Sequence, residues 1–250
     1  MNGLAKINKG RQSRPRRIMI YGVHGIGKST FGAMATNPIF VPTEDGIADI
    51  DTDSFPLAET YEDFLANLTT LASEEHEYQT AVVDSADWLE RLIWARVCAQ
   101  HKVKNIEEIG YAKGYTFALQ YWSEVMQALN YLRLDKSMTI VLIAHAQIEK
   151  FDNPETESYD RYSPKLHKKA SAIVQEWCDE VLFANYQTFT RNEDQGFGKD
   201  RTIATGSGDR ILRTTERPAH VAKNRCGLPD EIPLDWREYA KHAFHKGESA

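Results

Sequence analysis

The segment from Gly22 to Ser29 constrains the fold of this chain more than any other feature. Its sequence, GVHGIGKS, fits the pattern GxxxxGK[ST]. It follows a short apolar run, Arg16–Tyr21, and precedes a segment of helical character, Phe31–Ala35. Between a strand and a helix, such a glycine-rich turn presents consecutive backbone N–H groups that bind phosphate oxygens. The pattern therefore predicts a phosphate-binding loop in an α/β fold, with a chance match as the alternative.

The ligand expected at this loop is ATP with Mg²⁺. Lys28 would bridge the β- and γ-phosphates, and the Ser29 hydroxyl would bind Mg²⁺. The positive end of the following helix would add to the attraction for phosphate. The residues expected to bind the nucleotide are Gly22, Val23, His24, Gly25, Ile26, Gly27, Lys28, Ser29 and Thr30.

Two acidic residues at the ends of other predicted strands complete the expected site. Asp84 ends the apolar run Thr80–Val83, as in a Walker B motif, and is the second expected Mg²⁺ ligand. Glu44 follows the predicted strand Ile39–Val41 and would orient or deprotonate the attacking water. The alternatives are a helix N-cap for Asp84 and an acidic turn for Glu44, with Asp45 as the second candidate base.

A polar group after the most apolar run, Met138–Ala144, would sense the γ-phosphate. His145 and Gln147 are equal candidates for this role. A histidine hydrogen-bonded near the sheet edge is the alternative for His145.

Strands alternate with helices along most of the chain, which predicts parallel pairing with a sheet covered on both faces. The expected fold is α/β: a P-loop core with a mostly parallel sheet, helices on both faces and an antiparallel edge from the strands of 180–215. Residues 60–71 are expected to form a helix capped by Thr60, and 149–165 and 191–200 to be loops. The domain prediction is a basic flexible tail, 1–15, and one domain, 16–250.

Composition limits the class of protein. No run reaches the roughly 18–20 apolar residues of a membrane helix, and the N-terminus lacks a secretory apolar region. Three widely spaced cysteines argue against a disulfide framework or a zinc site. These features predict a cytoplasmic protein with no membrane partner. The net charge is −6, but 6–17 and 161–169 are locally basic and would meet phosphates.

Several segments together resemble a known family. They are Gly22–Thr30, Glu44–Gly46, Val82–Ser85, Gly110–Tyr115 and Ile143–His145. In these segments the chain resembles the phage-encoded RecA/Rad51-like P-loop ATPases, of AAA type, that serve single-strand annealing and recombination. The resemblance covers about residues 16 to 234, and its most specific parts are the GYAKGY segment and the Ala144-His145 pair after the central strand.

The resemblance implies roles for further residues. The catalytic glutamate of RecA-like proteins corresponds to Glu44, and their DNA-binding loop corresponds to 149–165. Lys223 and Arg225 resemble an element that supplies cations to the active site of a neighbouring subunit, with an exposed turn as the alternative. The resemblance thus implies a homo-oligomer, ring or filament, that binds ATP at its interfaces, with a single-strand-binding or recombination protein as a further partner.

Single-stranded DNA is the expected macromolecular ligand. Tyrosines would stack on bases and cations would pair with the backbone. The candidate residues are Tyr159, Arg161, Tyr162, Lys165, Lys168 and Lys169. An acidic loop with incidental tyrosines is the alternative.

Three functions are compatible with the sequence. The first is an ATP-dependent single-stranded DNA-binding protein of phage recombination or annealing, hydrolysing ATP at subunit interfaces. A small-molecule or nucleotide kinase is the second, although 191–201 is a weak candidate for its arginine-rich lid. The third is an assembly factor that binds ATP without catalysis.

Overall fold

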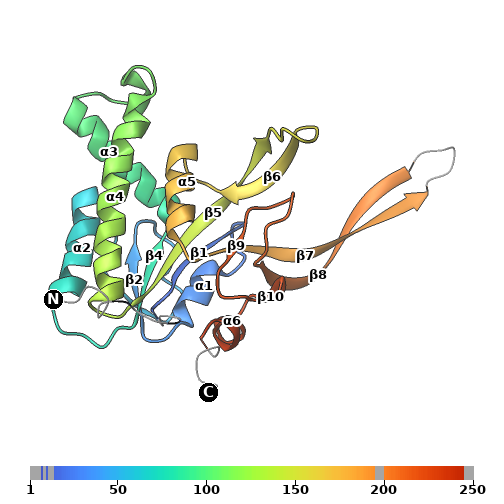
Figure 1. Cartoon of the computed structure of the whole chain (residues 1–250), viewed down its shortest axis with the longest axis horizontal. Coiled ribbons are helices and arrows are strands. Elements are labelled where there is room, and N and C mark those ends of the chain that lie inside the picture. The colour runs from blue at the N-terminus through green and yellow to red at the C-terminus, as the bar shows by residue number, and fades with distance from the viewer. Residues whose placement is uncertain (1–6, 8–9, 11–13, 195–199, 245–250) are drawn as a thin grey trace.

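The computed structural model describes residues 7, 10, 14–194 and 200–244. The described strands form one sheet in the order β10-β8-β7-β1-β5-β4-β2-β3, with β6 on β5 and β9 on β7 (Figure 1). Their bounds are β1 Arg17–Gly22, β2 Pro38–Pro42, β3 Asp53–Ser54, β4 Thr80–Asp84, β5 Thr139–Phe151, β6 Tyr159–Pro164, β7 Glu180–Asp194, β8 Asp200–Arg213, β9 Lys223–Asn224 and β10 Glu231–Pro233.

The pairing confirms the predicted fold class. Strands β3, β2, β4, β5, β1 and β7 are parallel to their neighbours, whereas β8 and β10 are antiparallel and form the edge beyond β7. Because β5 lies between β1 and β4, the end of the phosphate-loop strand and the end of the Asp84 strand flank the end of β5. In register, Gly22 pairs with His145, and Asp84 pairs with Ile143.

Helices cover both faces of the sheet. Their bounds are α1 Lys28–Ala33, α2 Tyr61–Ser73, α3 Ala86–His101, α4 Lys113–Leu134, α5 Lys168–Trp177 and α6 Trp236–Ala243, with a 3-10 turn, η2, at Ile106–Glu108. Apolar residues alternate between the faces along each strand, as the period of two requires. One face packs against α2 to α5 and the other against α1 and α6.

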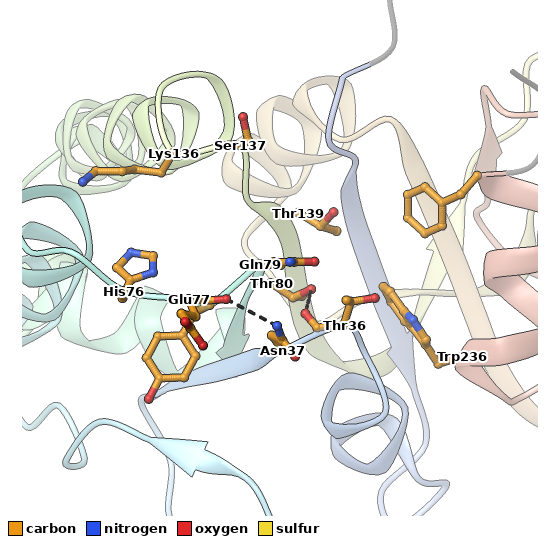
Figure 2. Close-up of a pocket in the computed structure, with 12 residues that line it drawn as sticks. Thr36, Asn37, His76, Glu77, Gln79, Thr80, Lys136, Ser137, Thr139 and Trp236 are labelled. Carbon is orange, nitrogen blue, oxygen red and sulfur yellow. Dashed lines mark hydrogen bonds between the residues drawn. The ribbon is translucent and has the colours of Figure 1, made fainter. Parts of the chain in front are cut away.

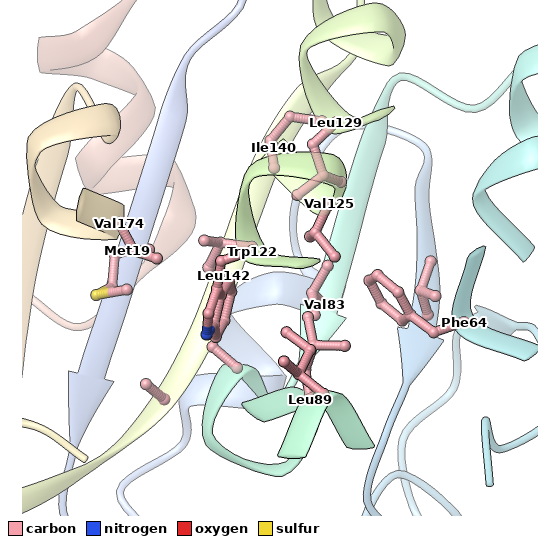
Figure 3. Packing of buried hydrophobic residues seen from close by; sticks show 14 of the residues in the cluster. Met19, Phe64, Val83, Leu89, Trp122, Val125, Leu129, Ile140, Leu142 and Val174 are labelled. Atoms are coloured by element: carbon pink, nitrogen blue, oxygen red, sulfur yellow. The ribbon is translucent and has the colours of Figure 1, made fainter. Parts of the chain in front are cut away.

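The larger core lies under α2 to α5. There Trp122 of α4 is 1% exposed and lies beside Leu142 of β5 (Figure 3). Phe64 of α2 and Val174 of α5 are buried in the same cluster. The helix cap predicted at Thr60 is confirmed: its hydroxyl accepts a hydrogen bond from the Asp63 N–H, and the Asp63 carboxylate accepts one from the Thr60 N–H.

The prediction of a loop over 149–165 was wrong. β5 continues to Phe151 and pairs antiparallel with β6, so most of this segment is a hairpin joined by 152–158. The period of two is short here: Ala146 to Glu149 alternate between apolar and polar residues, but Lys150 occupies the next apolar position.

The loop predicted at 191–200 was also wrong at both ends, because 191–194 pair with 200–203 in a hairpin of β7 and β8. This hairpin extends from the body of the molecule as a long arm (Figure 1). Residues 195–199 lie outside the described part.

Two arginines at the start of the predicted domain, Arg16 and Arg17, hold it to neighbouring elements. Arg16 donates to Glu180 and to the Ala243 carbonyl, and Arg17 forms an ion pair with Asp179 at 2.8 Å. These two arginines therefore bind the chain start to β7 and α6. Of the predicted tail, 1–6, 8–9 and 11–13 lie outside the described residues.

A cavity of about 770 Å³ lies at the amino ends of the strands (Figure 2). Its lining includes Asn37 and Gln79, which directly precede β2 and β4, and Ser137, which lies two residues before β5. It is therefore at the opposite edge of the sheet from the phosphate loop, and none of the predicted site residues lines it. Within the described residues, no helix is both long and apolar enough to cross a membrane.

Candidate nucleotide site

The predicted phosphate loop connects β1 to α1, as the sequence pattern requires. Gly25 and Gly27 have φ values of +71° and +106°, in the left-handed region that favours glycine. Gly22 is constrained differently, since a Cβ there would collide with the carbonyl oxygen of Ala184 on the adjacent β7. Each of the three glycines is therefore required by the backbone conformation or by close packing of the loop. Backbone N–H groups of such a loop can bind phosphate oxygens.

Lys28 is folded back into the loop. Its Nζ donates to the carbonyl oxygens of Gly22 and Val23, at 3.2 and 3.0 Å, and the residue is 6% exposed. Burial lowers the pKa of Lys28, and the nearby carboxylates of Asp84 and Glu44 partly offset the shift. A poorly solvated ammonium with only carbonyl partners is suited to exchange them for phosphate oxygens.

Ser29 and Asp84 lie together. Ser29 Oγ donates to Asp84 Oδ2 at 2.6 Å, and Asp84 is 3% exposed at the end of β4. Burial raises the pKa of Asp84, while the Ser29 hydrogen bond and the Lys28 charge lower it. Mg²⁺ prefers a few protein oxygens together with phosphate and water. A hydroxyl and a carboxylate at this distance fit that requirement, so Ser29 and Asp84 would hold the ion.

In the described part of the chain, no group of three or more His, Cys, Asp or Glu side chains is arranged to hold a metal.

Glu44 lies at the same edge of the sheet. The N–H groups of Thr43 and Glu44 donate to the carbonyl oxygen of Asp84, at 2.7 and 3.3 Å, so the end of β2 is bound to the end of β4. Burial raises the pKa of Glu44, and His145, whose Nε2 is 3.9 Å from Glu44 Oε1, opposes this shift. A half-buried carboxylate with a raised pKa beside the loop has the properties of a general base.

His145 connects the phosphate loop to α3. Its Nε2 is 3.1 Å from Nδ1 of His24, and its Nδ1 is 3.0 Å from Oδ2 of Asp87. Asp87 Oδ1 also accepts a hydrogen bond from the His145 N–H at 3.0 Å. Burial alone would raise the pKa of Asp87, but these bonds outweigh it and the pKa is lowered. His145 therefore faces a carboxylate on each side.

Gln147 points elsewhere. Its amide donates to the carbonyl oxygens of Pro164 and Leu166, at 3.3 and 3.4 Å, at the root of the β5–β6 hairpin. Of the two residues ranked equally in the sequence, His145 contacts the phosphate loop and Gln147 holds the hairpin.

Two carboxylates of α3 were missed by the sequence reasoning. Neither Asp87 nor Glu90 belongs to a motif recognised in the sequence. Glu90 is 3% exposed, and its Oε2 accepts from the His167 N–H at 2.9 Å. Burial raises the pKa of Glu90 to about 7. The available signal was their spacing of three residues just after a strand that ends in aspartate.

Lys223 and Arg225 lie far from the loop of their own chain. β9 pairs with Glu180 and Val181 at the start of β7, whereas Ala184 further along β7 pairs with Gly22. The Lys223 ammonium donates to three carbonyl oxygens at the end of α5, those of Gln175, Glu176 and Cys178, at 2.6–2.8 Å. These contacts favour a helix-capping role for Lys223.

The side chain of Arg225 is less constrained by contacts than that of Lys223. Its side chain is 55% exposed, and Nη1 lies 3.7 Å from Oδ1 of Asp179. Of the pair predicted to act on a neighbouring subunit, only Arg225 thus presents a guanidinium largely to solvent.

The residues predicted to bind single-stranded DNA divide into two groups. Arg161 is 3.3 Å from Glu149 and lies 4.0 Å from the Phe151 ring, and Tyr162 stacks on Phe183. Their side chains are already engaged, and Tyr159 packs near Phe151. Three exposed lysines lie at the root of the hairpin and the start of α5, namely Lys165, Lys168 and Lys169, of which Lys169 donates a hydrogen bond to Thr116 Oγ1 at 2.8 Å.

Comparison with known proteins assigns a family. A model of the AAA domain family AAA_24 matches residues 14–226, most of the chain. The chain belongs to this family. As an AAA domain it is a P-loop ATPase by class, and the matched residues include the predicted phosphate loop from Gly22 to Ser29.

Among curated proteins, this AAA domain is similar to the SPbeta prophage-derived uncharacterized protein YorG of Bacillus subtilis (strain 168). The two are 28% identical over 217 residues. The match covers 85% of this chain and 60% of YorG, so the chain spans about three fifths of that relative. Among solved structures, the RadB recombinase is 12% identical with a TM-score of 0.48, and the match covers 90% of each chain.

Proposed function

We propose that this AAA domain hydrolyses ATP with Mg²⁺ at an interface between copies of the chain. The observation that carries the proposal is the cluster at the carboxyl ends of β1, β2, β4 and β5. There Ser29 Oγ lies 2.6 Å from Asp84 Oδ2, and Glu44 lies at the same edge with His145. Positioned charge of this kind is what phosphoryl transfer requires, because the protein's main task is to stabilise the transferring group.

In this mechanism each residue of the cluster has a separate task. Lys28 would exchange the carbonyls of Gly22 and Val23 for phosphate oxygens, and Ser29 and Asp84 would hold Mg²⁺, which neutralises charge on the phosphates. Glu44 would orient the attacking water and accept its proton. His145 would keep Glu44 in place and register occupancy of the loop through His24.

Arg225 would act in trans. It lies at the amino end of β7, away from its own phosphate loop, and is exposed. A guanidinium donated by a neighbour would stabilise charge on the transferring phosphoryl group and make hydrolysis depend on assembly.

The proposed ligand of the assembled protein is single-stranded DNA, in phage recombination or annealing. The support is the RecA-like resemblance in the sequence, the prophage origin of the related YorG, and the exposed Lys165, Lys168 and Lys169 beside the hairpin that begins at His145. The hairpin is where nucleotide state and DNA contact would meet.

Hydrolysis tests the catalytic part of the proposal. Wild-type protein should release phosphate from ATP-Mg²⁺, and Glu44→Gln should lower kcat by roughly 10²–10⁴ while still binding ATP. Equal rates for the two proteins would leave an ATP-binding assembly factor as the function. A phosphorylated small molecule in place of free phosphate would identify a kinase.

DNA binding is tested separately. Replacing Lys165, Lys168 and Lys169 by alanine should weaken binding of a labelled oligonucleotide and flatten its dependence on salt concentration, because fewer counterions are released. The control replaces Lys102 and Lys104, two exposed lysines that directly follow the C-terminal end of α3. Absence of wild-type binding at low salt would overturn the DNA assignment.

A further inference from the structure

Arg210 of β8 lies beside the phosphate loop. A Cβ built on Gly27 would be 3.0 Å from Nη1 of Arg210 and 3.8 Å from Cδ2 of Leu234. Arg210 belongs to no sequence motif and lies 183 positions after Gly27, so nothing in the sequence pattern links the two residues.

The backbone at Arg210 is fixed although its side chain is exposed. The Arg210 carbonyl oxygen accepts a hydrogen bond from the Leu234 N–H at 2.9 Å. The neighbouring Ile211 pairs with Asn185 of β7 and Pro233 of β10. The guanidinium is therefore delivered to the loop by a strand that is paired on both sides.

This guanidinium has no acidic partner among the described residues, although most other arginines near the sheet do. Arg16, Arg17, Arg133 and Arg213 all lie within 4 Å of a carboxylate. An unpaired guanidinium next to backbone N–H groups that face a ligand concentrates positive charge at one place. A bound phosphate is the group that would neutralise it.

The order of strands shows which part of the nucleotide Arg210 would meet. Asp84 and Glu44 follow β4 and β2, on one side of β1, whereas Arg210 lies on β8, on the other side. The γ-phosphate must lie near the Mg²⁺ ligands and the base, so the nucleotide extends from them across the loop toward β8. Arg210 is then at the nucleoside end.

From these relations, which rest on the proposed function, the geometry points to Arg210 as a nucleotide-binding residue that contacts the α-phosphate and ribose end of the bound nucleotide within its own subunit. It differs in this from Arg225, whose proposed target is the γ-phosphate of a neighbour. A contact with the α-phosphate and ribose, which do not react, stabilises the ground state and the transition state equally. Its loss therefore raises KM and spares kcat.

The test is calorimetric titration of the full chain with ADP-Mg²⁺ and with a non-hydrolysable ATP analogue, beside steady-state hydrolysis. Arg210→Ala should weaken the binding of both nucleotides by the same factor, about tenfold or more, as expected for a charge-assisted contact. KM should rise and kcat should change little. Arg210→Lys should lose less, and Arg217→Ala, which removes an exposed arginine paired with Asp230, should match wild type.

The outcomes separate this inference from the proposed function. If wild type binds, Lys28→Ala does not, and Arg210→Ala binds like wild type, the inference alone is overturned. It is also overturned if Arg210→Ala weakens only the ATP analogue, or lowers kcat at constant KM, since both would place the contact at the γ-phosphate. If wild type binds neither nucleotide, both fail.

Discussion

Asp87 and Glu90, one helical turn apart on α3, bind the two ends of the same hairpin. Asp87 accepts a hydrogen bond from the His145 N–H at 3.0 Å, and Glu90 accepts one from the His167 N–H at 2.9 Å. Because α3 directly follows the Asp84 strand, one element links the predicted Mg²⁺ ligand to both roots of the β5–β6 hairpin. The relationship gives each carboxylate a distinct and measurable role.

For Asp87 the informative change is Asp87→Asn. It removes the charge that holds the His145 ring, and the loss of a buried charged hydrogen bond costs roughly 1.5–3 kcal/mol. Nucleotide binding should persist, while stimulation of hydrolysis by single-stranded DNA should be largely lost. Phosphate release with and without an oligonucleotide measures this. Undiminished stimulation in the variant would show that His145 does not link the two sites.

For Glu90 the expected effect is on stability against pH. Its folded-state pKa of about 7 lies above the ordinary value, so the folded state binds the extra proton and stability falls as pH rises from about 4.5 to about 7. Glu90→Gln keeps an acceptor for the His167 N–H and removes the charge. The free energy of unfolding of the variant should therefore rise relative to that of wild type as pH rises through this window, by an amount on the order of 3 kcal/mol in total. Chemical unfolding at pH 5 and pH 8 tests the sign, and a gap between the proteins that is constant with pH would contradict it.

Two glycines offer a matched pair of substitutions. Gly22→Ala would force the Ala184 carbonyl of β7 to shift, costing about 1–3 kcal/mol, and should abolish nucleotide binding by moving the loop. A Cβ on Gly46 meets nothing within 4 Å, and its φ is not in the left-handed region, so Gly46→Ala should be close to neutral. Thermal unfolding and nucleotide titration measure both. If the two variants have the same thermal stability and nucleotide affinity, the Ala184 carbonyl of β7 can move away from residue 22 at little cost.

Lys223 and Arg225 should separate stability from catalysis. Lys223→Ala leaves the carbonyls at the end of α5 without their ammonium and should lower the free energy of unfolding by about 1–3 kcal/mol. Arg225→Ala removes a half-exposed side chain and should leave stability within about 0.5 kcal/mol of wild type but abolish hydrolysis.

Mixing tests whether Arg225 acts in trans. An Arg225→Ala subunit keeps Glu44, and a Glu44→Gln subunit keeps Arg225, so one of the two kinds of mixed interface has a complete site. Partial recovery of hydrolysis in the mixture is expected. Mixtures as inactive as their components would rule out donation across the interface.

Much of the site was accessible from the sequence because it depends on strand order near one edge. Ser29, Glu44, Asp84 and His145 each follow or begin an element whose type was readable, and parallel strands bring their carboxyl ends together. Arg210 was not accessible, because its place beside Gly27 depends on the antiparallel pairing of β8 with β7 on one side and with β10 on the other. Lys223 was assigned by its neighbours in sequence, whereas its contacts come from α5, more than forty residues earlier.

The hairpin was missed for a different reason. A solvent-exposed two-stranded ribbon buries little, so its sequence carries almost no hydrophobic periodicity to read. In the stretch beyond His145, the alternation of apolar and polar residues lasts only from Ala146 to Glu149, and the apolar Ile148 is 64% exposed. Only pairing with β6 distinguishes it from a loop.

β5 is one uninterrupted strand from Thr139 in the core to Phe151 in the hairpin. The part beyond His145 is about 20 Å long at the usual rise per residue. Because the strand continues without interruption past the sheet edge, it would act as a lever that turns about the hydrogen-bonded pair of His145 and Asp87. A rotation there too small to disturb the nucleotide contacts would sweep the hairpin tip through several ångströms. Events at the phosphates would thereby become displacements on the scale of a nucleic-acid strand.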